Sequence, residues 1–297
     1  MVKIEINKET QTDEYCSFIL RNTDISIANA LRRIMLAEVP TMAINEVNII
    51  TNTTCCHSEF INQRLGLIPL ISYDVDKFNF PNDCDCNGIG CVNCTVSFEI
   101  DINNTSDKII YATVKDIIHI KNEHETENSV MPLLSNEDNY DQDYEKEIVL
   151  LKIGENQQLK LQCHAVKGIG KRNSKWNPTC TVSYQIQPKI TIDKNIMYGT
   201  TIENLEKVKN SCPTNVFKIG NTLDIEDANK CMFCNECVNM SNSLKINGLV
   251  NVEMDTTTFN FVIESNGSLK AIDILKSAIK ELSNKLNKLK TSINNID

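Results

Sequence analysis

The chain has 297 residues, 41% of them hydrophobic, which is enough for one large domain or two smaller ones. It carries 39 acidic and 30 basic residues, and the net charge of −9 excludes a protein whose main role is to coat nucleic-acid phosphates. No apolar run approaches the ~20 residues of a membrane span, and the first residues look like a charged strand rather than a signal peptide. We therefore expect a soluble protein.

The first forty residues predict two strands and a helix. Apolar residues alternate over residues 2–6 and 16–20, which is typical of paired strands with one buried face. A helical apolar stripe follows, capped by Asp24 or Ser26 and unable to continue past Pro40. The stripe includes Ile27, Leu31, Ile34 and Met35.

The middle of the chain, from Met42 to about Ile192, predicts a mostly antiparallel β region. Apolar residues alternate strictly over 96–102, 159–163 and 180–186. The stretch 123–147 is different, because it holds nine acidic residues and a single lysine, a net charge of −8. It predicts an exposed acidic loop, with a docking site for a basic partner as the alternative.

The last third predicts a helix over 201–210, a cysteine-bearing segment to residue 240, and two strands over 250–254 and 259–263. A long helix over 268–293 ends the pattern, about 39 Å long at 1.5 Å per residue. Its apolar residues follow heptad spacing: Ile272, Leu275, Ile279, Leu282, Leu286, Leu289 and Ile293. Leaving them in water would cost on the order of 14 kcal/mol, so we favour burial against a second subunit over a helix covered by its own domain.

Eight of the thirteen cysteines fall in two groups, which favours metal ligands over disulfides in a chain without an export signal. The first cysteine cluster consists of Cys84, Cys86, Cys91 and Cys94. Four thiolates within eleven residues can close a tetrahedral zinc site, and the intervening glycines permit the tight turn. With four protein ligands such a site is structural, and the alternative is a loop of unliganded cysteines.

The second cysteine cluster consists of Cys212, Cys231, Cys234 and Cys237. Its last three members have the C-x-x-C-x-x-C spacing of a ferredoxin iron–sulfur loop, and the Cys212-Pro213 pair can supply the fourth ligand. Ser241 stands where the loop's own C-P cysteine would be. The four ligands suit one [4Fe–4S] cluster, with zinc as the serious alternative and an empty site as the third.

No catalytic site can be built from the remaining residues. Gly168-Ile169-Gly170-Lys171 looks like the end of a phosphate loop, but Ala165 and Arg172 replace the residues that such a loop needs. The four histidines are dispersed, and Trp176 is expected in the core. We therefore expect a protein that is not an enzyme by itself.

Three segments together resemble one family. Residues 29–40 (NALRRIMLAEVP) resemble the alpha motif of the assembly subunits of cellular RNA polymerases, and 64–70 (RLGLIPL) look like the segment that follows it. Gly168-Ile169-Gly170-Lys171 with Lys175-Trp176-Asn177-Pro178 is similar to the family's G-x-G-K…K-W-x-P signature. The resemblance spans nearly the whole chain. It is to the larger of the two alpha-like subunits, which has an archaeal form and is the third-largest subunit of eukaryotic RNA polymerase II.

The resemblance implies an α+β fold in three parts. A dimerisation domain of antiparallel strands and two packing helices would comprise 1–45 and 246–297. An inserted β-rich domain would comprise 46–195, with a zinc loop at 84–94 and the acidic loop at 123–147. A small ferredoxin-like segment would comprise 205–243. Having both cysteine clusters departs from the usual polymerase II subunit, which leaves the metal of the second open between [4Fe–4S] and zinc.

The function implied is assembly of a DNA-directed RNA polymerase. The apolar residues of the two helices would pair with the smaller alpha-like subunit, and the heterodimer would then dock the two large catalytic subunits, with small subunits and DNA reached through the complex. Arg32 and Arg33 would be contacts to a large subunit or else ordinary solvated residues. The alternatives are the equivalent subunit of polymerases I and III and a stand-alone iron–sulfur electron carrier. The location would be the nucleus in a eukaryote, and the cytoplasm or virion for a large DNA virus.

Overall fold

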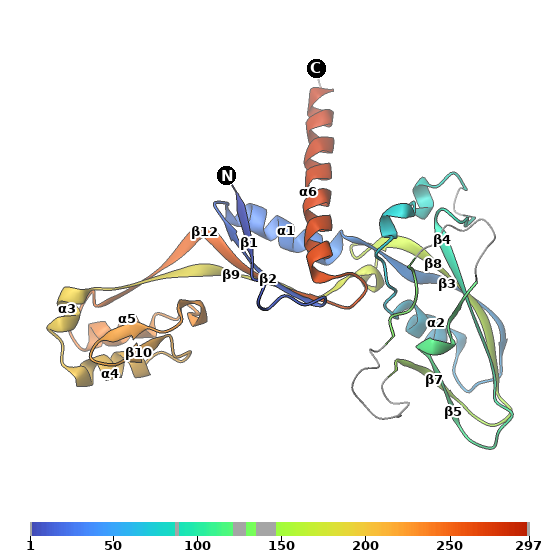
Figure 1. Cartoon of the computed structure of the whole chain (residues 1–297), viewed down its shortest axis with the longest axis horizontal. Helices are drawn as coiled ribbons and strands as arrows, with labels where there is room; N and C mark the ends of the chain where they lie inside the picture. The colour runs from blue at the N-terminus through green and yellow to red at the C-terminus, as the bar shows by residue number, and fades with distance from the viewer. Residues whose placement is uncertain (1, 87–88, 121–128, 135–146, 296–297) are drawn as a thin grey trace. The chain divides into compact units, whose positions relative to one another are not determined.

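The computed structural model describes residues 2–86, 89–120, 129–134 and 147–295 (Figure 1). It is a mixed α+β chain that divides into two compact units. Unit 1 comprises Met1–Ile6, Phe18–Ala28 and Tyr184–Phe261; unit 2 comprises Asn7–Ser17, Asn29–Ser183 and Val262–Asp297. The division into three domains stays a prediction. Among the described residues, no helix is both long enough and apolar enough for a membrane crossing.

One sheet contains the first and last strands of the chain. Its order is β1 (Lys3–Ile6), β2 (Tyr15–Arg21), β12 (Val250–Ser265) and β9 (Thr179–Ile192). Strands β1 and β2 are antiparallel, with Ile4 opposite Leu20, as the alternating pattern predicts. On β2 and β12 the rings of Phe18 and Phe261 stack with centroids 4.8 Å apart. Residues 250–263 form one continuous strand, so the prediction of two separate strands is wrong.

Helix α1 (Ile25–Ala37) begins where the sequence predicts. The side chain of Asp24 accepts hydrogen bonds from the backbone N–H groups of Ser26 (2.8 Å) and Ile27 (3.1 Å). These bonds, chiefly the one from Ile27, lower the pKa of the Asp24 carboxyl. Asp24 is therefore the N-cap, and Ser26 lies inside the helix.

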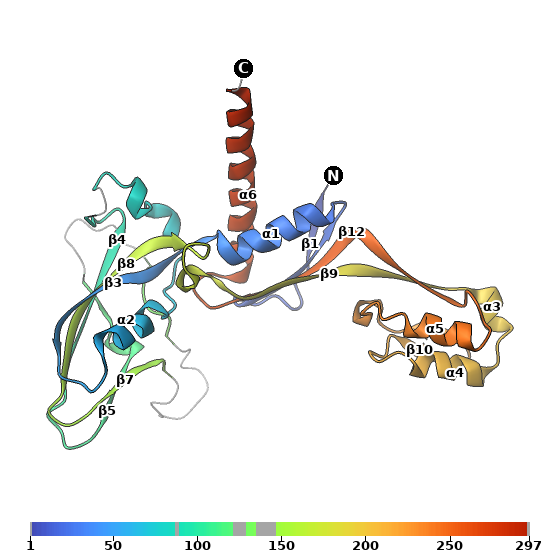
Figure 2. The same ribbon diagram turned by 180° about the vertical axis from the view of Figure 1, so that it is seen from behind.

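Unit 2 contains a second sheet, in the order β3 (Pro40–Asn52), β8 (Gln158–Ile169), β4 (Thr95–Asn103) and β6 (Ile118–His119). A two-stranded ribbon of β5 (Ile110–Thr113) and β7 (Val149–Ile153) accompanies it. Helix α2 (Ser58–Gly66) contacts both β3 and β7 (Figure 2). The apolar core between them includes Ile61, Leu65, Phe98, Ile100 and Leu161. The period-two prediction for this region is confirmed for the strands but missed α2.

Most of the predicted acidic loop lies outside the described residues. Of the described part, Val130 is buried in the core of unit 2, and Pro132 forms a β-bridge with Leu70. Residues 129–134 are therefore attached to the domain.

A small subdomain of unit 1 carries the second cysteine cluster. It consists of α3 (Lys194–Tyr198), α4 (Ile202–Asn210), β10 (Phe217–Ile219), β11 (Leu223–Ile225), the 3-10 helix η7 (Ala228–Lys230) and α5 (Glu236–Ser243). Its own core includes Leu205, Val208 and Phe217. The predicted helix over 201–210 corresponds to α4.

Close packing explains two glycines of the G-x-G-K signature. Trp176 is buried, and its indole N–H donates to the carbonyl of Val166 at 3.0 Å. A Cβ on Gly168 would lie 2.3 Å from the Trp176 ring, and a Cβ on Gly170 would lie 2.9 Å from the carbonyl oxygen of Leu36. Gly168 also lies within β8, so these glycines serve close packing rather than phosphate binding.

Candidate metal centres and pairing surface

The first cysteine cluster lies between the 3-10 helix η2 (Pro81–Asp83) and strand β4. The Cys84–Cys91 and Cys86–Cys94 sulfur pairs are each 3.5 Å apart, and the Cys91–Cys94 pair is 3.7 Å apart. All four sulfurs lie within 4.8 Å of one another. Gly90, with a φ of 95°, supplies the left-handed turn that brings Cys91 and Cys94 back to Cys84 and Cys86.

These distances fit a single tetrahedral ion. Four sulfurs at about 2.3 Å from a zinc ion stand about 3.8 Å apart. Without a cation so many thiols cannot ionise together: a hydrogen bond from the Asn93 backbone is outweighed by those with Cys84 and by burial, and the pKa of Cys91 rises to about 12. The cluster can therefore bind a metal ion such as zinc, whose charge would stabilise the thiolates.

The second cysteine cluster is brought together by different elements. Cys212 follows α4, Cys231 follows η7, and Cys237 lies in the first turn of α5. Cys234 is exposed, whereas the other three are buried. All four line one pocket, together with apolar side chains such as Val216 and Phe217. The predicted ligand set is therefore gathered around a common space.

The spacing of this second set is wider than that of the first. Among the described residues, the first cluster is the only group of three or more ligand residues whose ligand atoms gather closely enough to hold one metal ion, so the second is not closed to the spacing of a single ion. Burial raises the pKa of Cys237 to about 11, and the charges of the other three cysteines contribute to the increase. At Cys212 burial is outweighed by backbone hydrogen bonds, chiefly from Val216, and the thiol pKa is lowered. Ser241 points its hydroxyl at the Cys237 carbonyl, 2.7 Å away, within α5.

The predicted pairing surface is divided between covered and exposed residues. On α1, Leu31, Ile34 and Met35 are buried inside this chain, so they support the surface from beneath, and Ile27 is 39% exposed. On α6 (Ala271–Asn294), Leu275 is buried, and Ile272 and Leu282 are half-buried. The remaining apolar residues of α6 are 41% to 58% exposed: Ile279, Leu286, Leu289 and Ile293.

The two arginines beside the α1 stripe differ. Arg32 is half-buried and donates to the side-chain oxygen of Asn29 through Nε (3.2 Å) and Nη2 (3.1 Å). Arg33 is exposed.

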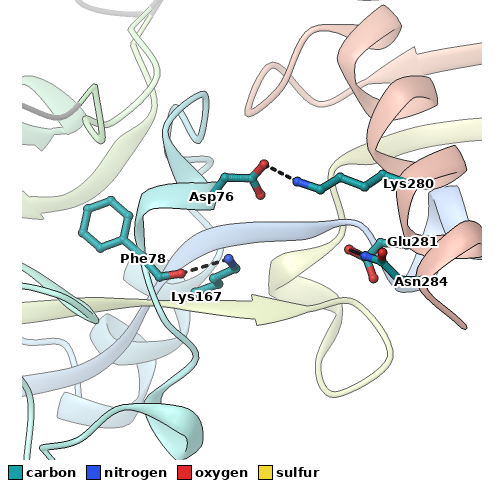
Figure 3. A network of polar contacts seen from close by, with 6 residues as sticks. All are labelled: Asp76, Phe78, Lys167, Lys280, Glu281 and Asn284. Atoms are coloured by element: carbon teal, nitrogen blue, oxygen red, sulfur yellow. Dashed lines mark hydrogen bonds and ion pairs between the residues drawn. The ribbon is translucent and has the colours of Figure 1, made fainter. Parts of the chain in front are cut away.

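Sequence reasoning missed the ion pairs that link α6 to the rest of unit 2. Lys280 forms an ion pair with Asp76 at 2.8 Å, and Lys285 forms one with Glu38 (Figure 3 shows the first pair). No local signal could reveal the first pair, because its partners are 204 residues apart in the sequence.

Comparisons with known proteins agree with this geometry. Residues 17–286 match the model of the RNA polymerase Rpb3/Rpb11 dimerisation domain. The chain is 38% identical over 275 residues to DNA-directed RNA polymerase II subunit rpb3 of Dictyostelium discoideum, covering 91% of this chain and 88% of that protein. It is 34% identical to the polymerase I and III subunit rpac1 of the same organism, covering 98% and 82%. It is 31% identical to subunit Rpo3 of Methanosphaera stadtmanae, covering 99% of each.

Proposed function

Because the chain belongs to the RNA polymerase Rpb3/Rpb11 dimerisation family, in which it is an assembly subunit without catalytic chemistry of its own, we propose that it pairs with a smaller Rpb11-like subunit through α6. The heterodimer then docks the two large subunits that carry out nucleotide transfer. Small subunits join this complex, and DNA is reached only through it. For a eukaryotic source, the proposed location is the nucleus.

The exposed heptad face of α6 carries this proposal. Its four exposed apolar residues all follow Ala278, the last fully buried residue of the helix. A helix that presents apolar side chains at steps of three and four is suited to packing along another helix. Burying them would remove apolar surface from water and contribute on the order of several kcal/mol to the free energy of pairing.

A double substitution tests the pairing. Leu282→Asp with Leu286→Asp places two charges in the proposed interface, and we expect the heterodimer to be lost in size-exclusion chromatography. The matched control is Asn287→Asp with Thr291→Asp, which adds the same two charges four residues apart on another side of the exposed helix. Retained pairing of the first variant, with both proteins folded by circular dichroism, would contradict the proposal.

The polymerase II form of the subunit is favoured over the form shared by polymerases I and III. The identity is higher to the polymerase II subunit than to the polymerase I and III subunit of the same organism. The first cysteine cluster points in the same direction. The large subunit that co-purifies with the tagged chain tests this choice.

We assign zinc to the first cysteine cluster and a [4Fe–4S] cluster to the second. The ferredoxin-type C-x-x-C-x-x-C spacing, with all four cysteines lining one pocket, supports the assignment at the second cluster. The decisive measurement is the metal content and visible absorbance of the anaerobically purified heterodimer. One zinc and four irons per chain, with absorbance near ~400 nm, would support both assignments. Two zincs and no iron would contradict the second.

A further inference from the structure

A short segment of unit 2 connects the first cysteine cluster with α6. This connecting segment, Ser72–Asp83, ends directly before Cys84. Near the cysteines, the backbone N–H of Asn79 donates to the carbonyl of Asn93 at 2.9 Å. At its other end, the N–H of Ser72 donates to the carbonyl of Ser268 at 2.8 Å, just before α6 begins. The same twelve residues therefore contact both features.

The middle of the connecting segment contacts α6 directly. Asp76 lies in the 3-10 helix η1 (Val75–Lys77), and its carboxylate pairs with the ammonium of Lys280 at 2.8 Å (Figure 3). Lys280 lies just beyond Ala278, the last fully buried residue of α6. The position of Asp76 therefore bears on the direction in which the exposed half of the helix leaves the domain.

A buried cation makes this segment sensitive to displacement. Lys167 of β8 is only 8% exposed, donates through Nζ to the carbonyl of Phe78 at 2.9 Å and lies 5.0 Å from the centroid of the Phe80 ring. Burial lowers the pKa of Lys167, and the negative charge of Asp76 opposes that decrease. A buried ammonium needs such partners, so the connecting segment has one strongly favoured position over Lys167.

The cysteine loop itself supplies little regular structure to hold this position. The described part of residues 84–94 contains no helix or strand, and apart from the Asn79–Asn93 bond its backbone hydrogen bonds are local turns. A metal ion bound by all four cysteines would cross-link this loop and fix the end of the connecting segment that leads back to Asp76. Without the ion, the connecting segment is no longer held by metal bonds at its Cys84 end.

We propose that metal binding by the first cysteine cluster orients the exposed half of α6 through the connecting segment, with Asp76 and Lys280 as positioning residues. The metal centre then acts on subunit pairing from outside the pairing surface. This last step rests on the proposed function, whereas the coupling within the chain does not.

Zero-length cross-linking tests the coupling in the chain alone. A carbodiimide joins a lysine to a carboxylate in direct contact, and mass spectrometry quantifies the Asp76–Lys280 product. We expect its yield to fall at least about fivefold when zinc is removed by a chelator, and to return when zinc is restored. The control is the Asp101–Lys160 pair on the sheet of the same unit, whose yield should not change. An unchanged Asp76–Lys280 yield in zinc-free protein would overturn the proposal.

Association kinetics with the Rpb11-like subunit test the consequence, using zinc-loaded protein so that folding is preserved. Asp76→Asn should slow association about two- to fivefold, the range of an exposed ion pair, whereas Asp101→Asn should not. The charge swap Asp76→Lys with Lys280→Asp should restore the rate. An Asp76→Asn rate equal to wild type, or a swap that fails to restore it, would overturn the positioning role. Absence of any binding by the wild type would instead contradict the proposed function, and the cross-linking result would still decide the coupling.

Discussion

The two cysteine clusters each offer four cysteine ligands but arrange them differently. The first draws its sulfurs from one eleven-residue stretch, and they stand 3.5 to 3.7 Å apart where they touch. The second draws them from 26 residues, between the end of α4 and the first turn of α5, and they line a pocket without closing to that distance. Ligand identity alone therefore does not choose the metal. We propose that the backbone that spaces the sulfurs selects the metal, and this difference can be tested at both clusters.

The largest effect is expected from removing a ligand of the first cysteine cluster. Cys94→Ser should abolish zinc binding, because a structural site with three protein ligands leaves the ion exposed to water. The binding free energy at stake is on the order of 10 kcal/mol, so we expect a large loss in the free energy of unfolding of unit 2. Metal analysis and urea unfolding followed by circular dichroism measure both. Cys55→Ser, at an exposed thiol outside the clusters, should change neither.

The first cysteine cluster should also lose its zinc on acidification. In the metal-free loop the pKa of Cys91 is raised to about 12, so this thiol carries a proton at neutral pH and must release it on binding. Lowering the pH therefore favours the metal-free form, and the apparent zinc affinity should fall at least about tenfold per pH unit. Competition with a chelator between pH 8 and pH 6 measures this. An affinity independent of pH would show that the thiols are already ionised.

The open cluster should respond separately. Cys234→Ser removes its exposed ligand, and we expect the absorbance near ~400 nm and the iron content to fall while one zinc per chain remains. The two clusters lie in different units, which is why the zinc site should not change. A fall in zinc from two to one, with no iron in either protein, would mean that both clusters bind zinc.

The smallest effects should come from the turns. Gly90→Ala forces a side chain into a left-handed position, with its Cβ 3.3 Å from Thr95 Oγ1, and should cost about 1–2 kcal/mol of unit 2 stability. In the second loop Asn235, with a φ of 60°, already carries a side chain there, so Asn235→Gly should be nearly neutral. Equilibrium unfolding of each variant checks the contrast. Equal losses for both would contradict it.

The sequence predicted the parts whose pattern is local. The β1–β2 pairing, the start of α1 and the heptads of α6 follow from side chains that repeat at the period of their own element. Helix α2 escaped because its nine residues lie within a long period-two region and carry only two buried apolar residues, Ile61 and Leu65. The continuity of β12 escaped because the run Asp255–Thr258 has no apolar residue to mark it as strand.

The candidate sites were predictable in their ligands and less so in their geometry. Cysteine spacing named all eight residues, and the first cluster needed little more because a short loop fixes its own distances. In the second, the separation of Cys212 from the other three depends on how α4 and α5 pack, which no spacing encodes. The covered state of Leu31, Ile34 and Met35 and the Asp76–Lys280 pair likewise depend on tertiary structure.

The position of Trp176 against Gly168 makes the protein its own spectroscopic probe. As the only tryptophan, buried in unit 2 with Lys175 Nζ 4.5 Å from its ring centroid, it dominates the emission excited at long ultraviolet wavelengths. That emission reports on one unit and is blind to the other. With the proposed [4Fe–4S] cluster bound at the second cysteine cluster, a melt followed by fluorescence and by iron absorbance would thus record the two units of one polypeptide as two separate curves.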